Sequence, residues 1–421
     1  MPRSPSARTA GVVLILGWLA ILPLTRLTAK EDRWIGTWGA SPSPQLSTEA
    51  DILAAQLTFL DQTLRQIVHT SIGGSVVRVR LSNAYGKETV QIAAAHLAVS
   101  AGGGAIVPGS DLPLTFGGSP TAVLPADAVL LSDPVELTVP PDGDLSVSLY
   151  FKSPVSAAGI HYRAMQTAYV APGDLTAAEV LPAGGTLSVY AFLTRIEVLA
   201  PSGSATLVTF GDSITDGALS SPAMNRRWPN LLARRLLSRT GEPLIGVVNS
   251  GIGGNRLLHD PAKMMQFGVN GLARFDRDVL TVPGVGYVIL LEGINDIGHP
   301  GGIAPIRESV TPNEIIGAMK QLITRAHDHG IKIFGATLLP FADTTHVGYF
   351  NPGKETTRQV VNAWIRTSTA FDGVIDFDLA TRDAMRPDQL LPLYDSGDHL
   401  HPNDRGYQAM AEAIELSLFK P

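Results

Sequence analysis

Cysteine is absent from this 421-residue chain. Its absence excludes disulfides, thiolate zinc sites, a cysteine nucleophile and a lipid-modified N-terminal cysteine. Charge is also scarce: charged residues make up 17% of the chain, below the usual quarter, and the mean hydropathy is +0.16. Such a composition indicates a large buried core, and the length favours two or three domains. With a formal net charge of -6 and no long run of Lys or Arg, nucleic acid is not an expected partner.

The chain also lacks an apolar run of about 20 residues, the length that a membrane-spanning helix needs. Its N-terminus carries Arg3 and Arg8, then a shorter apolar run over 12–24, and small residues that end at Ala29. This order predicts a secretory signal over 1–29. We therefore expect a secreted or periplasmic protein without a stable membrane span after removal of the signal. An uncleaved N-terminal anchor is the alternative.

The segment 30–200 alternates apolar and polar residues with a period of two. This alternation predicts strands at 64–70, 76–81, 90–99, 135–139, 145–151 and 190–199. Glycine-rich turn signals separate them, such as those at 73–74, 102–104 and 117–118. Many short strands of this kind predict a β-sandwich-like accessory domain, with an exposed loop over the Ala-, Gly- and Pro-rich stretch 172–188.

The pattern changes after 201–204, and strands begin to alternate with helices. Strands are predicted at 205–210, 244–249, 287–291, 331–337 and 374–377, and helices at 227–238, 312–329, 355–367 and 402–418. The helix at 312–329 has a clear start, since Thr311 and Glu314 form a capping-box pair around Pro312, and Gly330 suits its end. Such alternation predicts an α/β domain over 205–421, a parallel sheet with helices on both faces.

Four short motifs follow the predicted strands of this second domain or precede its last helix. They are Gly-Asp-Ser-Ile-Thr-Asp-Gly at 211–217, Asn-Ser-Gly-Ile-Gly-Gly-Asn-Arg at 249–256, Gly-Ile-Asn-Asp at 293–296 and Asp-His-Leu-His-Pro-Asn at 398–403. Ligands of parallel α/β sheets bind beyond the carboxyl ends of the strands. The four motifs are therefore expected to meet at one edge of the sheet.

Together the motifs supply the groups of a serine hydrolase. Ser213 is the candidate nucleophile, His401 the base that removes its proton, and Asp398 the carboxylate that orients the imidazole. Candidate donors to the oxyanion of the tetrahedral intermediate are the backbone N–H groups of Ser213 and Gly254 and the side-chain amide of Asn295. This chemistry needs no cofactor and no metal.

The four motifs closely resemble those of the SGNH hydrolases, also called the GDSL family of esterases and lipases. The resemblance covers 205–421 and implies a flavodoxin-like sheet of five parallel strands without a metal. It implies that the family's Ser, Gly, Asn and His correspond to Ser213, Gly254, Asn295 and His401, with Asp398 as the catalytic aspartate. Gly254 is preferred over Gly251 and Gly253, because family members place the donor glycine five residues after the asparagine that opens the block.

The N-terminal part has a second, less specific resemblance. Its segments Trp-Ile-Gly-Thr-Trp at 34–38 and Leu-Arg-Gln at 64–66 are similar to the accessory β-domain of a branch named for a xylanase-associated esterase. We therefore expect an exported serine esterase that removes a short acyl group, acetyl above all, from a carbohydrate. Alternatives are a lipase, lysophospholipase or arylesterase with the same triad, and a catalytically inert glycan-binding module. The oligomeric state is left open.

Several residues near the motifs have other interpretations. His399 and His401 could form a metal site with Asp398 and Asp260, because alternate residues of an extended segment share a face. That interpretation leaves the serine and asparagine motifs without a role, so a metal is not expected. Arg256 and His259 follow the glycine motif and are candidate substrate-binding residues. Asp212 and Asp216 are expected to hold their loop by accepting backbone N–H bonds.

Overall fold

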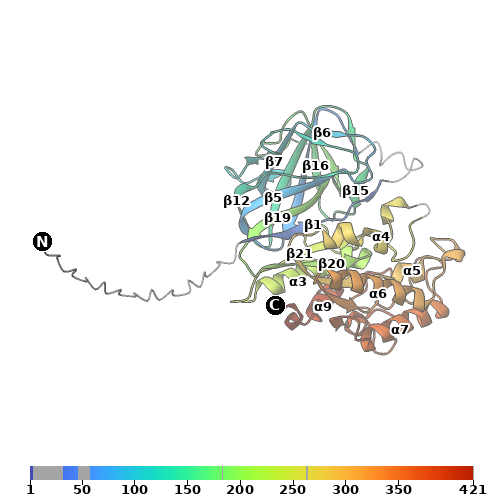
Figure 1. Ribbon diagram of the computed structural model, residues 1–421. Helices are drawn as coiled ribbons and strands as arrows, with labels where there is room; N and C mark the ends of the chain where they lie inside the picture. The colour runs from blue at the N-terminus through green and yellow to red at the C-terminus, as the bar shows by residue number, and fades with distance from the viewer. Residues whose placement is uncertain (3–31, 46–56, 183, 262–263, 421) are drawn as a thin grey trace. The chain divides into compact units, whose positions relative to one another are not determined.

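The computed structural model describes residues 1–2, 32–45, 57–182, 184–261 and 264–420 (Figure 1). Contacts divide the chain into residues 1–31 and 32–421, and the second unit contains every helix and strand given below. Nearly all of the predicted signal at 1–29 lies outside the described residues. Among the described residues, no helix has the length and apolar character to cross a membrane.

Residues 33–200 form antiparallel sheets. Seven strands pair in the order β17-β16-β4-β13-β7-β8 with β9 beside β7, and five pair in the order β1-β19-β5-β11 with β12 beside β5. The strands are β1 Arg33–Gly39, β2 Ser43–Pro44, β3 Thr58–Phe59, β4 Gln62–Thr70, β5 Gly74–Ser82, β6 Val90–Ile92, β7 Ala94–Gly102, β8 Ala105–Ile106, β9 Leu112–Pro113, β10 Ala122–Leu124, β11 Val129–Leu131, β12 Val135–Val139, β13 Gly143–Phe151, β14 Val155–Ser156, β15 Gly159–Tyr162, β16 Ala168–Pro172, β17 Gly185–Leu187, β18 Val189–Ala191 and β19 Leu193–Ala200. Both large sheets contribute side chains to one apolar cluster, as a β-sandwich requires.

Two of the predicted strands are each divided in the structure. The strand predicted over 190–199 breaks at Phe192, which adopts a left-handed φ of 63°. The break lets β18 pair with β15 while β19 pairs with β1 and β5. Similarly, β6 pairs with β10 whereas β7 pairs with β13. The stretch 172–188 includes β17, and its described part is only partly exposed, since Thr176 and Leu181 are buried.

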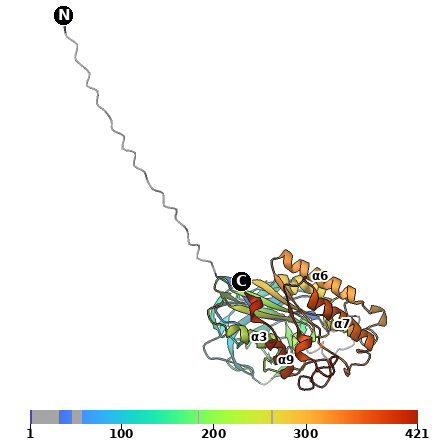
Figure 2. The ribbon, with the colours of Figure 1, turned by 90° about the horizontal axis from the view of Figure 1, so that it is seen from below.

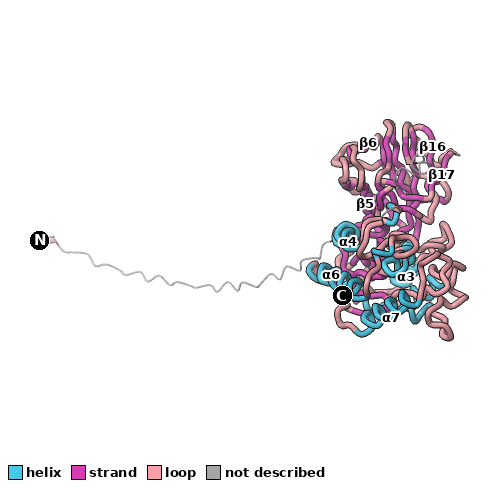
Figure 3. Tube along the Cα trace, turned by 90° about the vertical axis from the view of Figure 1, so that its right-hand side faces the viewer, coloured by secondary structure: helices cyan, strands magenta, loops and turns pink. Residues whose placement is uncertain are grey.

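The C-terminal half holds a parallel sheet in the order β21-β20-β22-β23-β24. Its strands are β20 Ala205–Gly211, β21 Ile245–Gly251, β22 Val285–Leu291, β23 Lys332–Ala336 and β24 Gly373–Ile375. Figure 3 shows that strands dominate the N-terminal part of residues 32–421, whereas helices surround the C-terminal sheet. The predicted fold class, a flavodoxin-like five-stranded parallel sheet with an N-terminal β-sandwich-like region, is confirmed. The domain boundaries at 30, 200 and 205 stay predictions.

The helices divide into two groups (Figure 2). In one group α3 packs against β21 and α9, and in the other α6 packs against β23, α4 and α7. The α-helices are α2 Ser213–Asp216, α3 Trp228–Leu237, α4 Gly271–Phe275, α5 Ile294–Gly298, α6 Pro312–Asp328, α7 Pro352–Thr367, α8 Phe377–Thr381 and α9 Asp404–Glu412. Shorter 3₁₀ or π turns are η2 Met265–Phe267, η3 Asp276–Leu280, η4 Ile306–Glu308 and η5 Leu416–Phe419.

Helix boundaries follow the capping chemistry where a signal exists. The predicted capping box of α6 forms, with Thr311 and Glu314 bonded reciprocally, and Gly330 adopts a left-handed φ of 68° just beyond the helix. The last predicted helix is shorter than expected. It ends at Glu412 instead of continuing to 418, and the apolar residues beyond it belong to η5.

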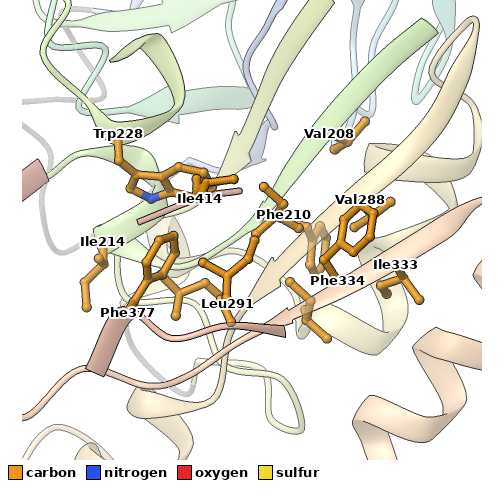
Figure 4. Packing of buried hydrophobic residues seen from close by; sticks show 14 of the residues in the cluster. Val208, Phe210, Ile214, Trp228, Val288, Leu291, Ile333, Phe334, Phe377 and Ile414 are labelled. Carbon is orange, nitrogen blue, oxygen red and sulfur yellow. The ribbon is translucent and has the colours of Figure 1, made fainter. Parts of the chain in front are cut away.

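Aromatic and aliphatic side chains between sheet and helices form the core beneath the strand ends. Trp228 at the start of α3 is fully buried and packs on Phe377, with ring centroids 5.4 Å apart (Figure 4). Phe210, the penultimate residue of β20, stacks edge-on with Phe275. Because close-packed interiors leave little room for displacement, these rings restrict movement of the loop after β20, which carries the first motif.

The β-rich region and the parallel sheet meet where β1 and the residues after β4 contact β20 and β21. The N–H of Gly36 donates to Thr206 Oγ1 at 2.9 Å, and the N–H of Val247 donates to Ser71 Oγ at 2.8 Å. The two backbones approach so closely that a Cβ on Gly246 would lie 2.1 Å from the carbonyl oxygen of Gly36. The two parts therefore share a tight, hydrogen-bonded interface.

Candidate active site

The motifs converge because three strands of the parallel sheet end side by side. Gly211 at the end of β20 is in register with Gly251 of β21 on one side and with Leu291 of β22 on the other. The residues that follow these ends enter loops at the same edge of the sheet. Gly211 itself has no room for a side chain, since a Cβ there would lie 2.3 Å from the carbonyl oxygen of Leu291.

Ser213, His401 and Asp398 form one continuous hydrogen-bonded chain. Ser213 Oγ lies 2.8 Å from His401 Nε2, and His401 Nδ1 lies 2.6 Å from Asp398 Oδ2. A carboxylate oxygen only accepts, so Nδ1 is the nitrogen that carries the proton and Nε2 is free to accept one from the serine. The serine and the histidine are both buried. This geometry matches the requirement for a hydroxyl activated by an oriented base.

The Asp398 carboxylate is held ionised by its surroundings. Burial alone would raise its pKa, but the hydrogen bond and the charge of His401, with N–H bonds from Leu400 and His401, outweigh burial and hold the pKa well below its usual range. Asp398 Oδ1 accepts these two backbone N–H bonds at 3.0 and 2.8 Å. The turn at 398–401 thus fixes the carboxylate and the imidazole together.

Two backbone N–H groups at this edge have no acceptor among the described residues. Asp212 caps α2 by accepting from Ile214, which leaves the Ser213 N–H without a partner. The Gly254 N–H lies in a turn where φ is 77°, and a Cβ there would lie 2.3 Å from the Phe267 ring. Only glycine satisfies both conditions, because L side chains rarely adopt such a φ.

The third candidate donor, the Asn295 amide, is locked in one orientation. Its Nδ2 donates to the carbonyl oxygen of Asn255 at 2.8 Å, and its Oδ1 accepts from the Tyr349 hydroxyl at 2.7 Å. A carbonyl oxygen cannot donate, so the group that faces Asn255 is the NH₂. One Nδ2 proton makes this bond and the other is left for a further acceptor. The amide is buried, as an oxyanion donor needs to be.

Comparison with known proteins agrees with this geometry. A family model described as "GDSL-like Lipase/Acylhydrolase family" matches residues 209–409, a range that begins in β20 and contains all four motifs. The C-terminal half of the chain belongs to the GDSL-like lipase/acylhydrolase family. The protein is accordingly a carboxylic ester hydrolase. No curated protein matches the chain as a whole or in part.

Several solved structures are similar to about half of this chain. A putative lipolytic protein of the G-D-S-L family from Desulfitobacterium hafniense is 23% identical, covering 50% of this chain and 97% of that chain with a TM-score of 0.36. The aryl esterase of M. smegmatis is 18% identical, covering 50% and 95% with a TM-score of 0.39. A carbohydrate acetylesterase from Sinorhizobium meliloti is 20% identical, covering 50% and 96% with a TM-score of 0.37.

A buried arginine links the end of β20 to the loop that follows β21. Arg274 is fully buried and donates to Asn255 Oδ1 at 2.7 Å and to the Gly211 carbonyl oxygen at 2.8 Å. It therefore ties the end of β20 to the residue that orients Asn295. Glu292 lies 3.5 Å from the same guanidinium, and burial raises its pKa well above the ordinary value.

The prediction that both aspartates of the first motif accept backbone N–H bonds is confirmed for Asp212 and is wrong for Asp216 among the described residues. Asp212 accepts the N–H of Ile214, and burial raises its pKa to about 7. Asp216 instead contacts a side chain of the β-rich region, since its Oδ1 lies 3.0 Å from His161 Nε2. A further carboxylate, Asp296, accepts the N–H groups of Leu257 and Leu258, and burial raises its pKa to about 6.

A small cavity of about 70 Å³ opens beside the proposed nucleophile. Its floor is buried and its rim is exposed. The residues that line it are Tyr162, Arg163, Ser213, Gly253, Gly254, Phe267, Asn295, His299, Ile303, His346, Tyr349, Leu400 and His401. A larger hollow of about 530 Å³ lies in the β-rich region, but no histidine lines it. In the smaller cavity a serine hydroxyl is hydrogen-bonded to a histidine base.

Arg256 and His259, the candidate substrate-binding residues, are not among those that line the cavity. Arg256 is buried, and its guanidinium pairs with Glu308 at 2.8 Å and donates to the Asp260 carbonyl oxygen at 2.6 Å. His259 is half-buried beside it. The structure thus places Arg256 in an ion pair that orders its loop. A substrate contact for either residue stays a prediction.

The metal interpretation loses two of its four proposed ligands. His399 bonds to Asp395, and Asp260 Oδ1 accepts from Asn270 at 2.7 Å. Among the described residues, a group of three side chains whose histidine and carboxylate atoms all lie within 4.8 Å of one another is formed by His346, Asp398 and His401. A divalent ion held there would have to displace the hydrogen bonds of the triad.

Several residues of the cavity carried no signal in the sequence. Tyr349 and His346 lie in the loop after β23, and Tyr162 and Arg163 come from the β-rich region. His299 is buried, and burial, followed by the charges of Arg256, Lys354 and His346, lowers its pKa to about 3. It is therefore neutral at ordinary pH. No local pattern connects these residues with the four motifs, because their proximity depends on the complete fold.

Proposed function

We propose that this protein is an exported serine esterase that removes short acyl groups, acetyl above all, from carbohydrates. The observation that carries the proposal is the unbroken hydrogen-bonded chain from Ser213 Oγ to His401 at 2.8 Å and on to Asp398 at 2.6 Å. This arrangement supports acyl transfer through the serine, since each member has the partner that its role requires.

In the acylation half, Ser213 Oγ attacks the ester carbonyl carbon while His401 Nε2 takes the hydroxyl proton. Asp398 stabilises the resulting imidazolium. The carbonyl oxygen becomes negative and accepts hydrogen bonds from the N–H groups of Ser213 and Gly254 and from Asn295 Nδ2. When the intermediate collapses, the bond to the alcohol oxygen breaks and His401 returns its proton to that oxygen. The alcohol leaves, and the acyl group stays on the serine.

In the deacylation half, water takes the place of the alcohol. His401 removes a proton from the water, whose oxygen attacks the acyl carbon. The same three donors stabilise the second oxyanion. Collapse breaks the bond to Ser213 Oγ, which recovers its proton from His401, and releases the carboxylic acid. Every proton is thus returned through one imidazole, and no cofactor takes part.

Cavity size supports a short acyl group. The cavity of about 70 Å³ is far smaller than the roughly 300–1,000 Å³ of pockets that hold drug-sized ligands. Its floor includes the buried side chains of His299, Tyr349 and Leu400. A long acyl chain would have to leave this floor and lie across the exposed rim. Export rests on the signal pattern of 1–29, and the carbohydrate part rests on the resemblance of the N-terminal segments.

The test is an acyl-chain series of p-nitrophenyl esters beside acetylated xylan and acetylated oligosaccharides. We expect hydrolysis of acetyl esters and a sharp loss of rate at about eight carbons, because the cavity fixes the size of the acyl group. A preference for long chains would reject the short-chain proposal in favour of a lipase. Failure to release acetate from any sugar ester would reject the carbohydrate proposal.

Variants separate catalysis from binding. Ser213→Ala should lose at least about three decades of kcat, since the nucleophile is removed. Ser238→Ala is the matched control, because the hydroxyl of this exposed serine donates only to the Arg235 carbonyl oxygen among the described residues. Both variants should keep the wild-type melting temperature within a few degrees. Ester hydrolysis that survives in Ser213→Ala would overturn the assignment of the nucleophile.

A further inference from the structure

The β-rich region reaches into the candidate active site through β15 and the residue after it. Tyr162 ends β15 and Arg163 follows, and both line the same cavity as Ser213. Their neighbour His161 is buried, with Nδ1 2.9 Å from the Ser41 carbonyl oxygen and Nε2 3.0 Å from Asp216 Oδ1. Asp216 is the last residue of α2, which begins with the serine. The strand is thus bonded directly to the helix of the nucleophile.

The backbone at Arg163 is held in a conformation that an arginine rarely adopts. Its φ is 66°, and that of Met165 is 53°. Such strain persists only where the surroundings impose it, and it gathers at functional sites. Here the surroundings come from both halves: the Ala164 N–H donates to Ser188, and the Met165 carbonyl oxygen accepts from Ala223 at 2.8 Å. The Arg227 guanidinium also donates to the Ala164 carbonyl oxygen.

Arg163 is the one permanently charged residue that lines the cavity, and no Asp or Glu lines it. Its guanidinium makes no hydrogen bond or ion pair with the described residues. A Cβ built on Gly253 would lie 3.9 Å from both Arg163 Cδ and Ser213 Cβ and 3.8 Å from Asp216 Oδ2, so the arginine stem and the nucleophile flank the same glycine. The Arg163 guanidinium lies 5.8 Å from the centroid of the Tyr162 ring, and no carboxylate among the described residues is bonded to it. Such a cation attracts an anionic group of the substrate.

Burial indicates which part of the substrate carries that anion. The floor of the cavity is buried, whereas Arg163, Ile303 and His346 at its rim are exposed. The acyl group enters the floor and the alcohol remains at the rim, from which it leaves. We infer that Arg163 binds a carboxylate on the alcohol part, so that the preferred substrates are acetylated acidic sugars. The planar guanidinium suits a carboxylate because it donates two parallel N–H bonds. This inference rests on the proposed esterase function.

The test compares esters that differ in one group. The pair is an acetylated methyl glucuronoside and the methyl glucoside acetylated on the same hydroxyl, and a succinylated methyl glucoside places the carboxylate on the acyl part. Wild type should favour the glucuronoside by about tenfold in kcat/KM at low salt, the range of a charge-assisted contact at a partly exposed site. The ratio should fall as ionic strength rises, because salt screens an exposed pair.

Three variants complete the design. Arg163→Gln should bring the ratio close to one, and Arg163→Gly should do the same while removing the strained conformation, so its fold is not at risk. Arg386→Gln removes a charge from an exposed ion pair with Asp383 and should keep the wild-type ratio. A ratio that is unchanged in both Arg163 variants overturns the inference, and so does a preference for the succinyl ester. If wild type cleaves neither acetylated sugar but cleaves other esters, the proposed carbohydrate function fails first and the inference with it.

Discussion

Replacing Tyr349 by phenylalanine tests how the oxyanion donor is held in place. The Tyr349 hydroxyl donates to Asn295 Oδ1 at 2.7 Å inside the protein, and the residue is 2% exposed. Tyr349→Phe keeps the ring but leaves the amide oxygen without this donor. A buried polar atom without a partner costs about 1–3 kcal/mol, and we expect the free energy of unfolding to fall by that amount.

The same change should lower kcat by about tenfold and leave KM nearly unaltered. The reason is that the amide is still present but loses the bond that fixes its second proton toward the oxyanion. Removal of the donor itself, in Asn295→Ala, should cost more, about 10²–10³ in kcat. Steady-state kinetics with an acetyl ester and urea unfolding measure both effects. Tyr287→Phe is the control, because the Tyr287 ring packs on Phe334 and Phe419 and no hydrogen bond of its hydroxyl is found among the described residues.

A double-mutant cycle decides whether Tyr349 acts through Asn295. If it does, adding Tyr349→Phe to Asn295→Ala should change kcat by less than about twofold, since the amide is already gone. An equal loss of kcat in both backgrounds would refute the reasoning, as would wild-type kcat in the single variant. The first result would mean that the tyrosine affects kcat independently of Asn295, and the second that it serves packing alone.

Three further outcomes are expected. Gly246→Ala should lower the free energy of unfolding by about 1–3 kcal/mol, because its Cβ would lie 2.1 Å from a carbonyl oxygen of β1. Gly317→Ala, in open space on α6, should raise this free energy by up to about 1 kcal/mol. Denaturant unfolding in which Gly246→Ala is the more stable of the two variants would contradict the tight interface. The pKa of Asp398 is depressed in the folded state, so its carboxylate stabilises the fold fully above about pH 4 and less as the pH falls further. The free energy of unfolding of Asp398→Asn should therefore be lower than that of wild type above this pH, and the difference should shrink in acid. A pH-independent difference between the two urea curves would argue against the ionic role of Asp398. A chelator should leave acetyl-ester hydrolysis unchanged. Added Zn²⁺ should inhibit hydrolysis by binding His346, Asp398 and His401, and His346→Ala should weaken that inhibition. Loss of activity with the chelator and recovery with zinc would instead support metal catalysis.

The parts of the site that short-range patterns encode could be predicted from the sequence. Asp398 and His401 are three residues apart in one turn, so their contact depends on local geometry alone. Convergence of Ser213 and Asn295 follows from the rule that parallel strands end at one edge of the sheet. The α6 helix begins where its capping box predicts, because both partners lie within four residues.

The parts that depend on distant contacts could not be predicted. His161 meets Asp216 across 55 residues, and Arg256 pairs with Glu308 across 52, so no local spacing identifies either partner. Phe192 breaks a predicted strand by adopting a positive φ, which a bulky residue does only when tertiary pairing imposes it. The last helix ends at Glu412 without a glycine or proline stop, and packing of η5 takes over from periodicity there.

The central claim is that Ser213 carries the acyl group during turnover. Labelling with a fluorophosphonate, followed by intact-mass and peptide mass spectrometry, measures this directly. We predict one adduct per chain, located on Ser213, with loss of esterase activity in proportion to labelling, and no adduct in Ser213→Ala. Labelling at another residue, or full esterase activity in the labelled protein, would contradict the account.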